Sequence, residues 1–194
     1  IVASITPWNY PIMMAAWKIA PAVAAGNTVV IKPAPQTPLT TIMLAQTALE
    51  VGFPPGVISV VTGKGPGVGE PLVNHADVRM VSFTGSTRTG KRIMELAAQK
   101  VTRVHLELGG KAPFVVFADA DIEAAARGAV VGAYINTGQD CTAATRILVE
   151  RSCYDDFLAA FTQLSQQIRL GSPQVESTDM GPLISADQRQ RVHG

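Results

Sequence analysis

Residues 80–108 read MVSFTGSTRTGKRIMELAAQKVTRVHLEL, and this stretch decides the fold class. It begins with a short apolar run (80–84), continues with a longer segment of helical pattern (87–100) and closes on a second apolar run (104–108). Short apolar runs rich in β-branched residues predict buried strands, whereas the longer segment predicts a helix. A strand, a helix and a strand in succession are typical of parallel strands joined by a crossover.

The same alternation runs through the rest of the chain. Further strands are expected at residues 1–5, 28–31, 57–62, 114–117 and 147–149. Further helices are expected at residues 10–25, 38–51, 68–74, 121–136 and 152–170. Strands that are almost continuously apolar are covered on both faces. The sequence therefore predicts an α/β fold, a Rossmann-like parallel sheet with helices on both faces, followed by the start of a second α/β domain.

The double glycine Gly109-Gly110 interrupts the regular alternation, so we place a domain boundary there, between residues 1–108 and 109–194. Helix ends carry further signals. Ser152 with Asp155 resembles an N-terminal capping box for the helix expected at 152–170. Asp121 places negative charge at the start of the helix expected at 121–136, where the helix dipole favours it.

Composition excludes several classes of protein. Hydrophobic residues make up 47% of the 194 residues and charged residues 16%, which favours a buried core over disorder. The net charge of +1 gives no reason to expect nucleic acid or an anionic membrane as a partner. No apolar run approaches the ~18 residues of a membrane span. The three histidines and two cysteines have no metal-ligand spacing, so no metal site is expected.

The two cysteines are too few for a secreted disulfide scaffold, which favours a reducing, cytoplasmic location. The chain opens directly on a strand-like run without an initiator Met. It stops at Gly194 within a polar stretch that is typical of the start of a helix. We interpret these 194 residues as a fragment of a longer polypeptide.

Residues 136–146, NTGQDCTAATR, place Cys141 between a helical run and a strand-like run. A lone cysteine is more often a small buried hydrophobe than a nucleophile. Residues 63–69, GKGPGVG, lie between a strand and a helix, where backbone can approach a ligand closely and the helix start can hold an anion. This turn fits neither the G-x-G-x-x-G fingerprint nor the P-loop. Each feature alone leaves the function open.

A function is indicated only when five motifs are considered together. In chain order they are TPWNYP (6–11), IKPAP (31–35), SFTGST (82–87), LELGGK (106–111) and GQDC (138–141). In this combination the chain resembles the aldehyde dehydrogenase superfamily over essentially its whole length. The resemblance implies most of the cofactor-binding part, without its N-terminal portion, followed by the opening of the catalytic part.

The resemblance implies NAD(P)-dependent oxidation of an aldehyde to a carboxylic acid. Cys141 would attack the carbonyl to give a thiohemiacetal and later a thioester. The side-chain amide of Asn9 and the backbone N–H of Cys141 would stabilise the oxyanion. Glu107 would activate the water that hydrolyses the thioester. Its presence favours hydrolysis over acyl transfer to coenzyme A, although a single Glu near a strand end is often only a surface charge.

The resemblance also implies which residues bind the cofactor. Lys32 would contact the adenosine ribose, Ser86 the pyrophosphate, and glycines the adenine end. The full set is Trp8, Lys32, Gly65, Gly69, Gly85 and Ser86. Taken singly, Lys32 also fits a solvated strand end and Ser86 an N-cap. Pro35 stands where the family often has a Glu that would repel a 2′-phosphate, so either NAD or NADP is expected.

The string around Asp140 resembles enzymes that act on amino-aldehydes such as 4-aminobutanal, and a carboxylate there would attract an ammonium group. Two alternatives remain: a non-catalytic structural or binding relative of the same fold, and a semialdehyde dehydrogenase for an acidic substrate. The resemblance further implies a homodimer or homotetramer. Cys153 is expected to be structural.

Overall fold

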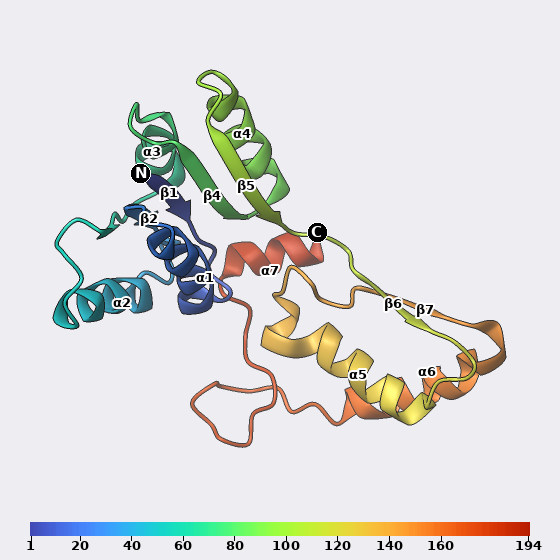
Figure 1. Ribbon diagram of the computed structural model, residues 1–194. Coiled ribbons are helices and arrows are strands. Elements are labelled where there is room, and N and C mark those ends of the chain that lie inside the picture. Colours follow the sequence, from blue (N-terminus) through green and yellow to red (C-terminus); the bar gives the residue numbers. More distant parts are fainter. The chain divides into compact units, whose positions relative to one another are not determined.

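The computed structural model describes all 194 residues and divides into two compact units, Ile1–Leu108 and Gly109–Gly194. We call them unit 1 and unit 2 and describe each by itself. Figure 1 follows the chain through both. No helix in the structure combines the length and the apolar character needed to cross a membrane.

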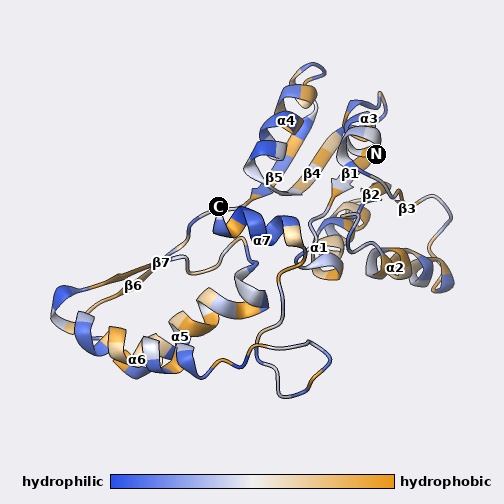
Figure 2. Ribbon diagram, turned by 180° about the vertical axis from the view of Figure 1, so that it is seen from behind, coloured by the Kyte–Doolittle hydropathy of each residue, from blue (hydrophilic) through white to orange (hydrophobic).

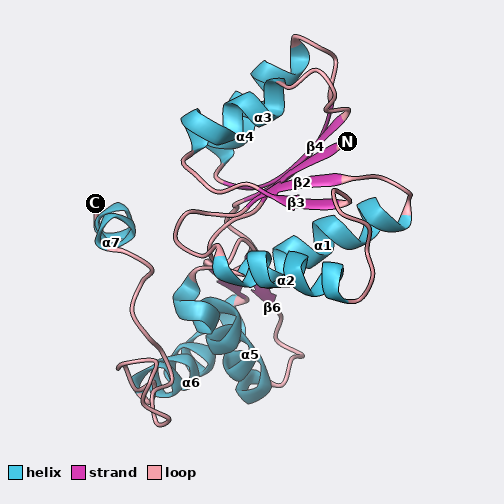
Figure 3. Cartoon of the chain, turned by 90° about the vertical axis from the view of Figure 1, so that its left-hand side faces the viewer, coloured by secondary structure: helices cyan, strands magenta, loops and turns pink.

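Unit 1 is built on a five-stranded parallel sheet in the order β3-β2-β1-β4-β5. Its strands are β1 (Val2–Ile5), β2 (Val29–Lys32), β3 (Ile58–Val60), β4 (Met80–Gly85) and β5 (Arg103–Leu108). Its helices are α1 (Pro11–Ala24), α2 (Leu39–Glu50), α3 (Glu70–Asn74) and α4 (Thr87–Ala98). Helices α1 and α2 cover one face and α3 and α4 the other (Figure 3). This confirms the predicted α/β fold with a parallel sheet and helices on both faces.

The apolar strands explain this layering. β1 is buried along its whole length and pairs with both β2 and β4, so that Val2 lies beside Val29 and Met80. One core cluster contains Ile5, Phe83 and Ile93. A second cluster contains Val2, Ala15 and Ile31. Because each strand contributes side chains to both faces, a buried parallel strand must be apolar almost throughout.

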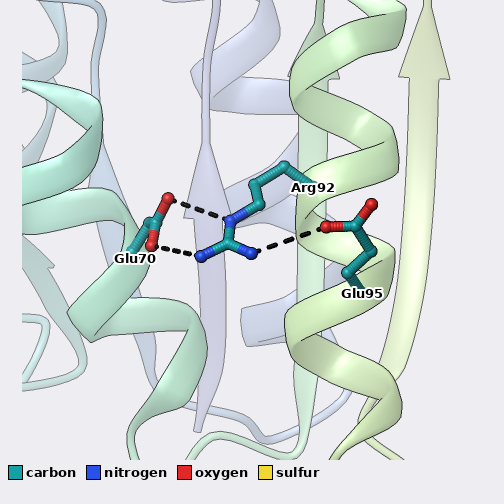
Figure 4. A network of polar contacts seen from close by, with 3 residues as sticks. All are labelled: Glu70, Arg92 and Glu95. Carbon is teal, nitrogen blue, oxygen red and sulfur yellow. Dashed lines mark hydrogen bonds and ion pairs between the residues drawn. The ribbon is translucent and has the colours of Figure 1, made fainter.

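Helices α3 and α4 are joined by an ion pair on the face that they share (Figure 4). Arg92 donates from Nε to Glu70 Oε1 at 3.1 Å and from Nη2 to Glu70 Oε2 at 3.0 Å. A further contact links Arg92 Nη1 to Glu95 Oε2 at 3.5 Å. The hydrogen bonds from Arg92 hold the pKa of Glu70 below its usual value. Because the pair is exposed, it orients the two helices more than it stabilises them.

Unit 2 contains two parallel strands, β6 (Pro113–Val116) and β7 (Arg146–Val149). Its helices are α5 (Ile122–Tyr134), α6 (Tyr154–Gln166) and α7 (Ala186–His193). Helices α5 and α6 share a core with Val116, Cys153 and Phe157. The Phe157 and Phe161 rings stack at 5.9 Å between centroids. Helix α7 is almost entirely hydrophilic, as Figure 2 shows, and none of its residues is buried.

One predicted helix start is wrong. The residues Arg151–Cys153 form a 3-10 turn, and α6 begins only at Tyr154. The Ser152 hydroxyl donates to Glu150 Oε1 at 3.2 Å and therefore caps nothing. Asp121, in contrast, caps α5, because its Oδ1 accepts from the backbone N–H of Ala124 at 3.0 Å. Helix α3 also begins later than expected, at Glu70, after a π-helical turn at Gly65–Gly69.

Candidate functional site

The predicted cofactor residues of unit 1 lie at or just beyond the carboxyl ends of its strands. Trp8 follows β1, Lys32 is the last residue of β2, and Ser86 follows β4. Gly65 and Gly69 lie in the turn after β3. The carboxyl ends of parallel strands share one edge of the sheet. The connections change direction between β1 and β4, and open α/β sheets bind ligands beside such a switch point.

Lys32 is buried, with 4% of its surface exposed. Its Nζ donates to the carbonyl of Pro33 at 3.1 Å, and burial lowers the pKa of its ammonium group. A Cβ added at Gly69 would lie 3.7 Å from Lys32 Cδ, so the lysine stem packs against the glycine-rich turn. Pro35, three residues further on, is exposed. The Lys32 side chain is therefore buried and fixed at the end of the strand, and it is not a solvated lysine.

The glycines of this edge differ in what they contact. A Cβ added at Gly65 or Gly67 would meet no atom within 4 Å, and neither residue has a positive φ. The protein's own packing therefore does not require glycine at these two positions, and their backbone faces open space that a ligand can approach. At Gly85 an added Cβ would lie 2.5 Å from Phe83 Cζ. Gly85 is thus required by the core of unit 1 itself.

Ser86 is the N-cap of α4. Its Oγ accepts from the backbone N–H of Thr89 at 3.3 Å and lies 2.9 Å from Thr89 Oγ1. Of the two roles considered for Ser86, N-cap and pyrophosphate contact, the structure therefore shows the N-cap. The N–H groups of the first helical turn are the usual donors to a phosphate at such a position.

A cavity of about 540 Å³ opens in unit 1 between α1 and strands β4 and β5. Its walls are largely apolar and include Trp17, and its polar lining is Lys18, Asn27, Ser82, Thr84, His105 and Glu107. The β4–β5 register pairs Ser82 with His105 and Thr84 with Glu107. Because side chains two apart on a strand share a face, these four point to the same side of the sheet. Trp8 and Asn9 do not line this cavity.

Lys18 was not predicted as a site residue, although it is the most unusual group in the cavity. It is 6% exposed and its Nζ donates to Ser82 Oγ at 3.0 Å. Ser82 Oγ in turn lies 3.2 Å from His105 Nδ1. Burial lowers the pKa of Lys18 to about 8, and the carboxylate of Glu107 offsets part of that shift. The sequence did contain a signal for the burial of Lys18. It lies four residues after Met14, a spacing that places both side chains on the buried face of α1.

Thr84 is a second residue that the sequence did not single out. It is 5% exposed, lines the cavity, and its Oγ1 has no hydrogen-bond partner within the protein. A buried hydroxyl without a protein partner costs about 1–3 kcal/mol unless water or a ligand satisfies it. The cavity is therefore polar enough at its floor to hold water or a polar ligand group next to Glu107.

In unit 2, Cys141 lies in a turn that begins with strained backbone. The turn Ile135–Gly138 follows α5, and Asn136, Thr137 and Gly138 have φ values of 51°, 62° and 68°. This left-handed conformation is rare for a β-branched residue such as Thr137. A residue held there costs about 1–3 kcal/mol and persists only when its surroundings determine it.

Side chains hold this turn in place. Asn136 Nδ2 donates to the Gln139 carbonyl, and Gln139 Nε2 donates to the Asn136 carbonyl, both at 3.2 Å. Gln139 Oε1 also accepts from the backbone N–H of Ile184 at 2.9 Å. Thr137 Oγ1 donates to the Gly181 carbonyl at 3.3 Å. The turn before Cys141 is thereby attached to the segment that precedes α7.

Asp140 and Cys141 occupy the end of the turn and both are half-buried. Asp140 Oδ1 accepts from the backbone N–H of Thr142 at 2.7 Å and from the Thr142 hydroxyl at 2.8 Å. Cys153 is buried in the core of unit 2 beside Phe157, which suits a structural residue. No group of three or more His, Cys, Asp or Glu side chains is arranged to hold a metal ion.

Comparison with known proteins gives a consistent result. Residues 1–194 match the model of the aldehyde dehydrogenase family. The chain is 48% identical over 185 residues to D-glyceraldehyde dehydrogenase (NADP(+)) of Picrophilus torridus, covering 95% of this chain and 37% of that protein. It is 47% identical over 192 residues to betaine aldehyde dehydrogenase of Bacillus subtilis, covering 99% and 39%.

The same likeness is found among solved structures. The crystal structure of betaine aldehyde dehydrogenase from Staphylococcus aureus in complex with NAD+ superposes with a TM-score of 0.95 at 48% identity. The match covers 98% of this chain and 38% of that one. The chain thus spans less than two-fifths of the length of each of these relatives.

Proposed function

Because the chain belongs to the aldehyde dehydrogenase family, we propose that this protein oxidises an aldehyde to a carboxylic acid with NAD or NADP. The observation that carries the proposal is the position of Trp8, Lys32 and Ser86 at the carboxyl edge of a parallel sheet with open glycine backbone at Gly65. This edge suits the pyrophosphate and ribose of a dinucleotide. The bound nicotinamide supplies the two-electron oxidant.

The side chains have separate tasks in this reaction. The Cys141 thiolate adds to the aldehyde carbonyl, and oxidation of that adduct leaves a thioester on its sulfur. The Asn9 amide and the backbone N–H of Cys141 donate to the oxyanion of the adduct. Glu107 takes a proton from the water that hydrolyses the thioester. The polar floor of the cavity at Glu107 and Thr84 supports this last role, since it offers partners for a water.

Thiol labelling of the full-length enzyme tests the assignment of the nucleophile. We expect Cys141 to react with iodoacetamide faster than Cys153, which is buried, and to be protected by aldehyde and cofactor together. Cys141→Ser should abolish cofactor reduction, whereas Cys153→Ser should retain it. A non-catalytic relative would show neither protection nor cofactor reduction with any of a panel of aldehydes.

The cofactor remains NAD or NADP in this proposal. Pro35 carries no acceptor for ribose hydroxyls and no charge against a 2′-phosphate, so both cofactors should be used. The test is kcat/KM with each cofactor, and an NAD preference of about a thousandfold, roughly 4 kcal/mol, would contradict the proposal. Pro35→Glu should weaken NADP use through repulsion of the phosphate and leave NAD use nearly unchanged.

For the substrate we propose an amino-aldehyde such as 4-aminobutanal. The support is the carboxylate of Asp140 in the turn that carries Cys141, where it favours an ammonium group. Asp140→Asn should lower kcat/KM for 4-aminobutanal relative to butanal. An unchanged ratio would rule out this role, and faster turnover of an acidic semialdehyde than of either would favour the acidic-substrate alternative.

Two further expectations stay predictions of the family resemblance. We propose that the full-length protein is a homodimer or homotetramer and that it is cytoplasmic. Light scattering on the purified protein tests the first, and cell fractionation tests the second.

A further inference from the structure

The turn that leads from α5 to Cys141 has a backbone that its own residues do not favour. Asn136, Thr137 and Gly138 have φ values of 51°, 62° and 68° in succession. Only glycine adopts this left-handed region freely, and a β-branched threonine is an outlier there. Such a backbone persists only where neighbouring groups determine it. The contacts that hold this turn therefore also determine where Cys141, three residues after Gly138, lies.

Gln139 uses both polar atoms of its side-chain amide at this turn. Its Nε2 donates to the Asn136 carbonyl at 3.2 Å, and its Oε1 accepts from the backbone N–H of Ile184 at 2.9 Å. A backbone carbonyl only accepts and a backbone N–H only donates, so the side chain must present a donor to one and an acceptor to the other. An ionised glutamate offers acceptors alone, and methionine offers no donor and a weak acceptor. An amide is thus the group that this position needs.

A second contact joins the turn to the same distant segment. Thr137 Oγ1, on a half-buried side chain, donates to the Gly181 carbonyl at 3.3 Å. Gly181 is 44 residues from Thr137 in the chain, and Ile184 is 45 residues from Gln139. Contacts from both sides of Gly138 fix the orientation of the turn as well as its position, which a single hydrogen bond does not do.

The segment 181–184, which receives both contacts, is itself held at its two ends. Before it, the backbone N–H of Met180 donates to the Arg169 carbonyl at 3.2 Å. The Arg169 guanidinium also donates to the Asp179 carboxylate at 2.9 and 3.0 Å. After it, Ser185 is the N-cap of α7. The segment can therefore serve as an anchor for the turn.

We propose that Thr137 and Gln139 are positioning residues, which anchor the turn to residues 181–184 and thereby fix Cys141 for attack on the aldehyde carbonyl. The proposal rests on the proposed function of Cys141 as the nucleophile. Two groups of Cys141 need this placement: the sulfur that bonds to the carbonyl carbon and the backbone N–H that donates to the oxyanion. The effect of the anchor is therefore on the rate of reaction and not on cofactor binding.

The experiment measures a single turnover of the full-length enzyme, with cofactor saturating and enzyme in excess over the aldehyde. The limiting rate constant of cofactor reduction at high enzyme concentration reports how well Cys141 is placed. A loss of folded enzyme raises the concentration needed for saturation but leaves that limiting rate constant unchanged. This separates a positioning role from a merely structural one.

Four variants and one control divide the contacts. Gln139→Met removes the donor and the strong acceptor at similar length, and Gln139→Glu removes the donor alone. Thr137→Val removes the hydroxyl from a side chain of the same shape, whereas Thr137→Ser retains it. Gln163→Met is the matched control, because Gln163 is an exposed glutamine of α6.

We expect the limiting rate constant to fall about tenfold to a hundredfold in Gln139→Met and Gln139→Glu, the order of effect of displacing a reacting group by about 1 Å. It should fall about tenfold in Thr137→Val and stay within about twofold of wild type in Thr137→Ser, which keeps the donor. The Kd for the cofactor should change by less than about twofold in all four variants, because none of them alters the placement of the cofactor. Gln163→Met should match wild type.

A wild-type limiting rate constant in either Gln139 variant would overturn the proposal. So would equal losses in Thr137→Val and Thr137→Ser, because the hydroxyl would then not be the group that matters. If neither wild type nor Gln163→Met reduces cofactor with any of a panel of aldehydes, the proposed function itself fails, and the positioning role fails with it. Cofactor reduction at the same rate in wild type and all four variants leaves the proposed function intact and removes the positioning role alone.

Discussion

A single carboxylate oxygen shapes the backbone next to the candidate nucleophile. Asp140 Oδ1 binds both the backbone N–H and the hydroxyl of Thr142, and the two residues flank Cys141. The sequence suggested a charge for a substrate ammonium, whereas the structure adds a second task, which is to close the turn. Charge and acceptor can be separated, because Asn keeps an oxygen acceptor in place and removes the charge.

We predict that Asp140→Ala lowers kcat/KM for charged and uncharged aldehydes alike, by about tenfold to a hundredfold, because misplacement of a reacting group by about 1 Å has that order of effect. Asp140→Asn should retain most activity with butanal. Thr142→Val, which keeps the backbone N–H but loses the hydroxyl, should fall between them. Equal activities of the Ala and Asn variants with butanal would show that the turn does not depend on this acceptor.

The second residue-scale prediction concerns two glycines with different surroundings. Gly85→Ala should destabilise the protein by about 1–3 kcal/mol, because the new Cβ overlaps the ring of Phe83, which is itself 4% exposed and cannot move away freely. Gly65→Ala should leave the melting temperature unchanged, since its Cβ meets nothing, while it raises the KM for the cofactor. Calorimetry and initial-rate kinetics on both variants provide the check.

At the scale of single residues, the sequence predicted the structural roles of some residues and not of others. Gly85 and Ser86 were visible, because a strand followed by Gly-Ser predicts a helix start. Lys18 was not, since a lysine in an amphipathic helix usually faces water, and its partner Ser82 is 64 residues away. The left-handed conformation of Thr137 was also hidden, because it depends on a hydrogen bond to Gly181 from a distant part of unit 2.

Among whole elements, the parallel strands were the most predictable. β1, β4 and β5 begin and end within one residue of their predicted limits, because continuous apolar runs leave few alternatives for a buried strand. The start of α6 was not predictable in the same way. Ser152 and Asp155 have the spacing of a capping box. The Ser152 hydroxyl instead donates to the carboxylate of the neighbouring Glu150, and the 3-10 turn Arg151–Cys153 precedes the start of α6.

An exposed ion pair closes the segment after α6 and leads to a pH prediction. Arg169 donates to Asp179 from Nε, Nη2 and its backbone N–H at 2.9 to 3.0 Å. These hydrogen bonds lower the pKa of Asp179 to about 2. Because the folded pKa lies below the ordinary value of 3.8, the stabilisation is complete above about pH 4 and is lost as the pH falls through about 2.

We predict that a carboxyl-carbon NMR titration of Asp179 has its midpoint near 2. Asp179→Asn should speed hydrogen exchange at the amides of Gly171 and Met180, which bond across the base of this loop, at pH 7. Asp156→Asn, an exposed carboxylate in α6, is the matched control and should change neither amide. A midpoint near 4 would show that the ion pair does not persist in solution.

For the whole molecule, the two-unit division is the feature with the clearest experimental consequence. Unit 1 ends at Leu108, and the following Gly109, Gly110 and Lys111 are all exposed. We predict that brief trypsin treatment of the 194-residue chain cuts first after Lys111 and yields residues 1–111 and 112–194. A first cut inside α4 or α6, measured by intact mass, would contradict this.

The position of β1 has a consequence for how the protein is made. β1 is the first of these strands to be synthesised, yet it lies in the middle of the sheet and must pair with β4, which ends at Gly85. At ordinary rates of translation, on the order of ten seconds separate the two strands. During that interval a strand that is fully buried in the folded protein and apolar except for Ser4 has only one of its neighbours available, which makes β1 a natural binding segment for a ribosome-associated chaperone.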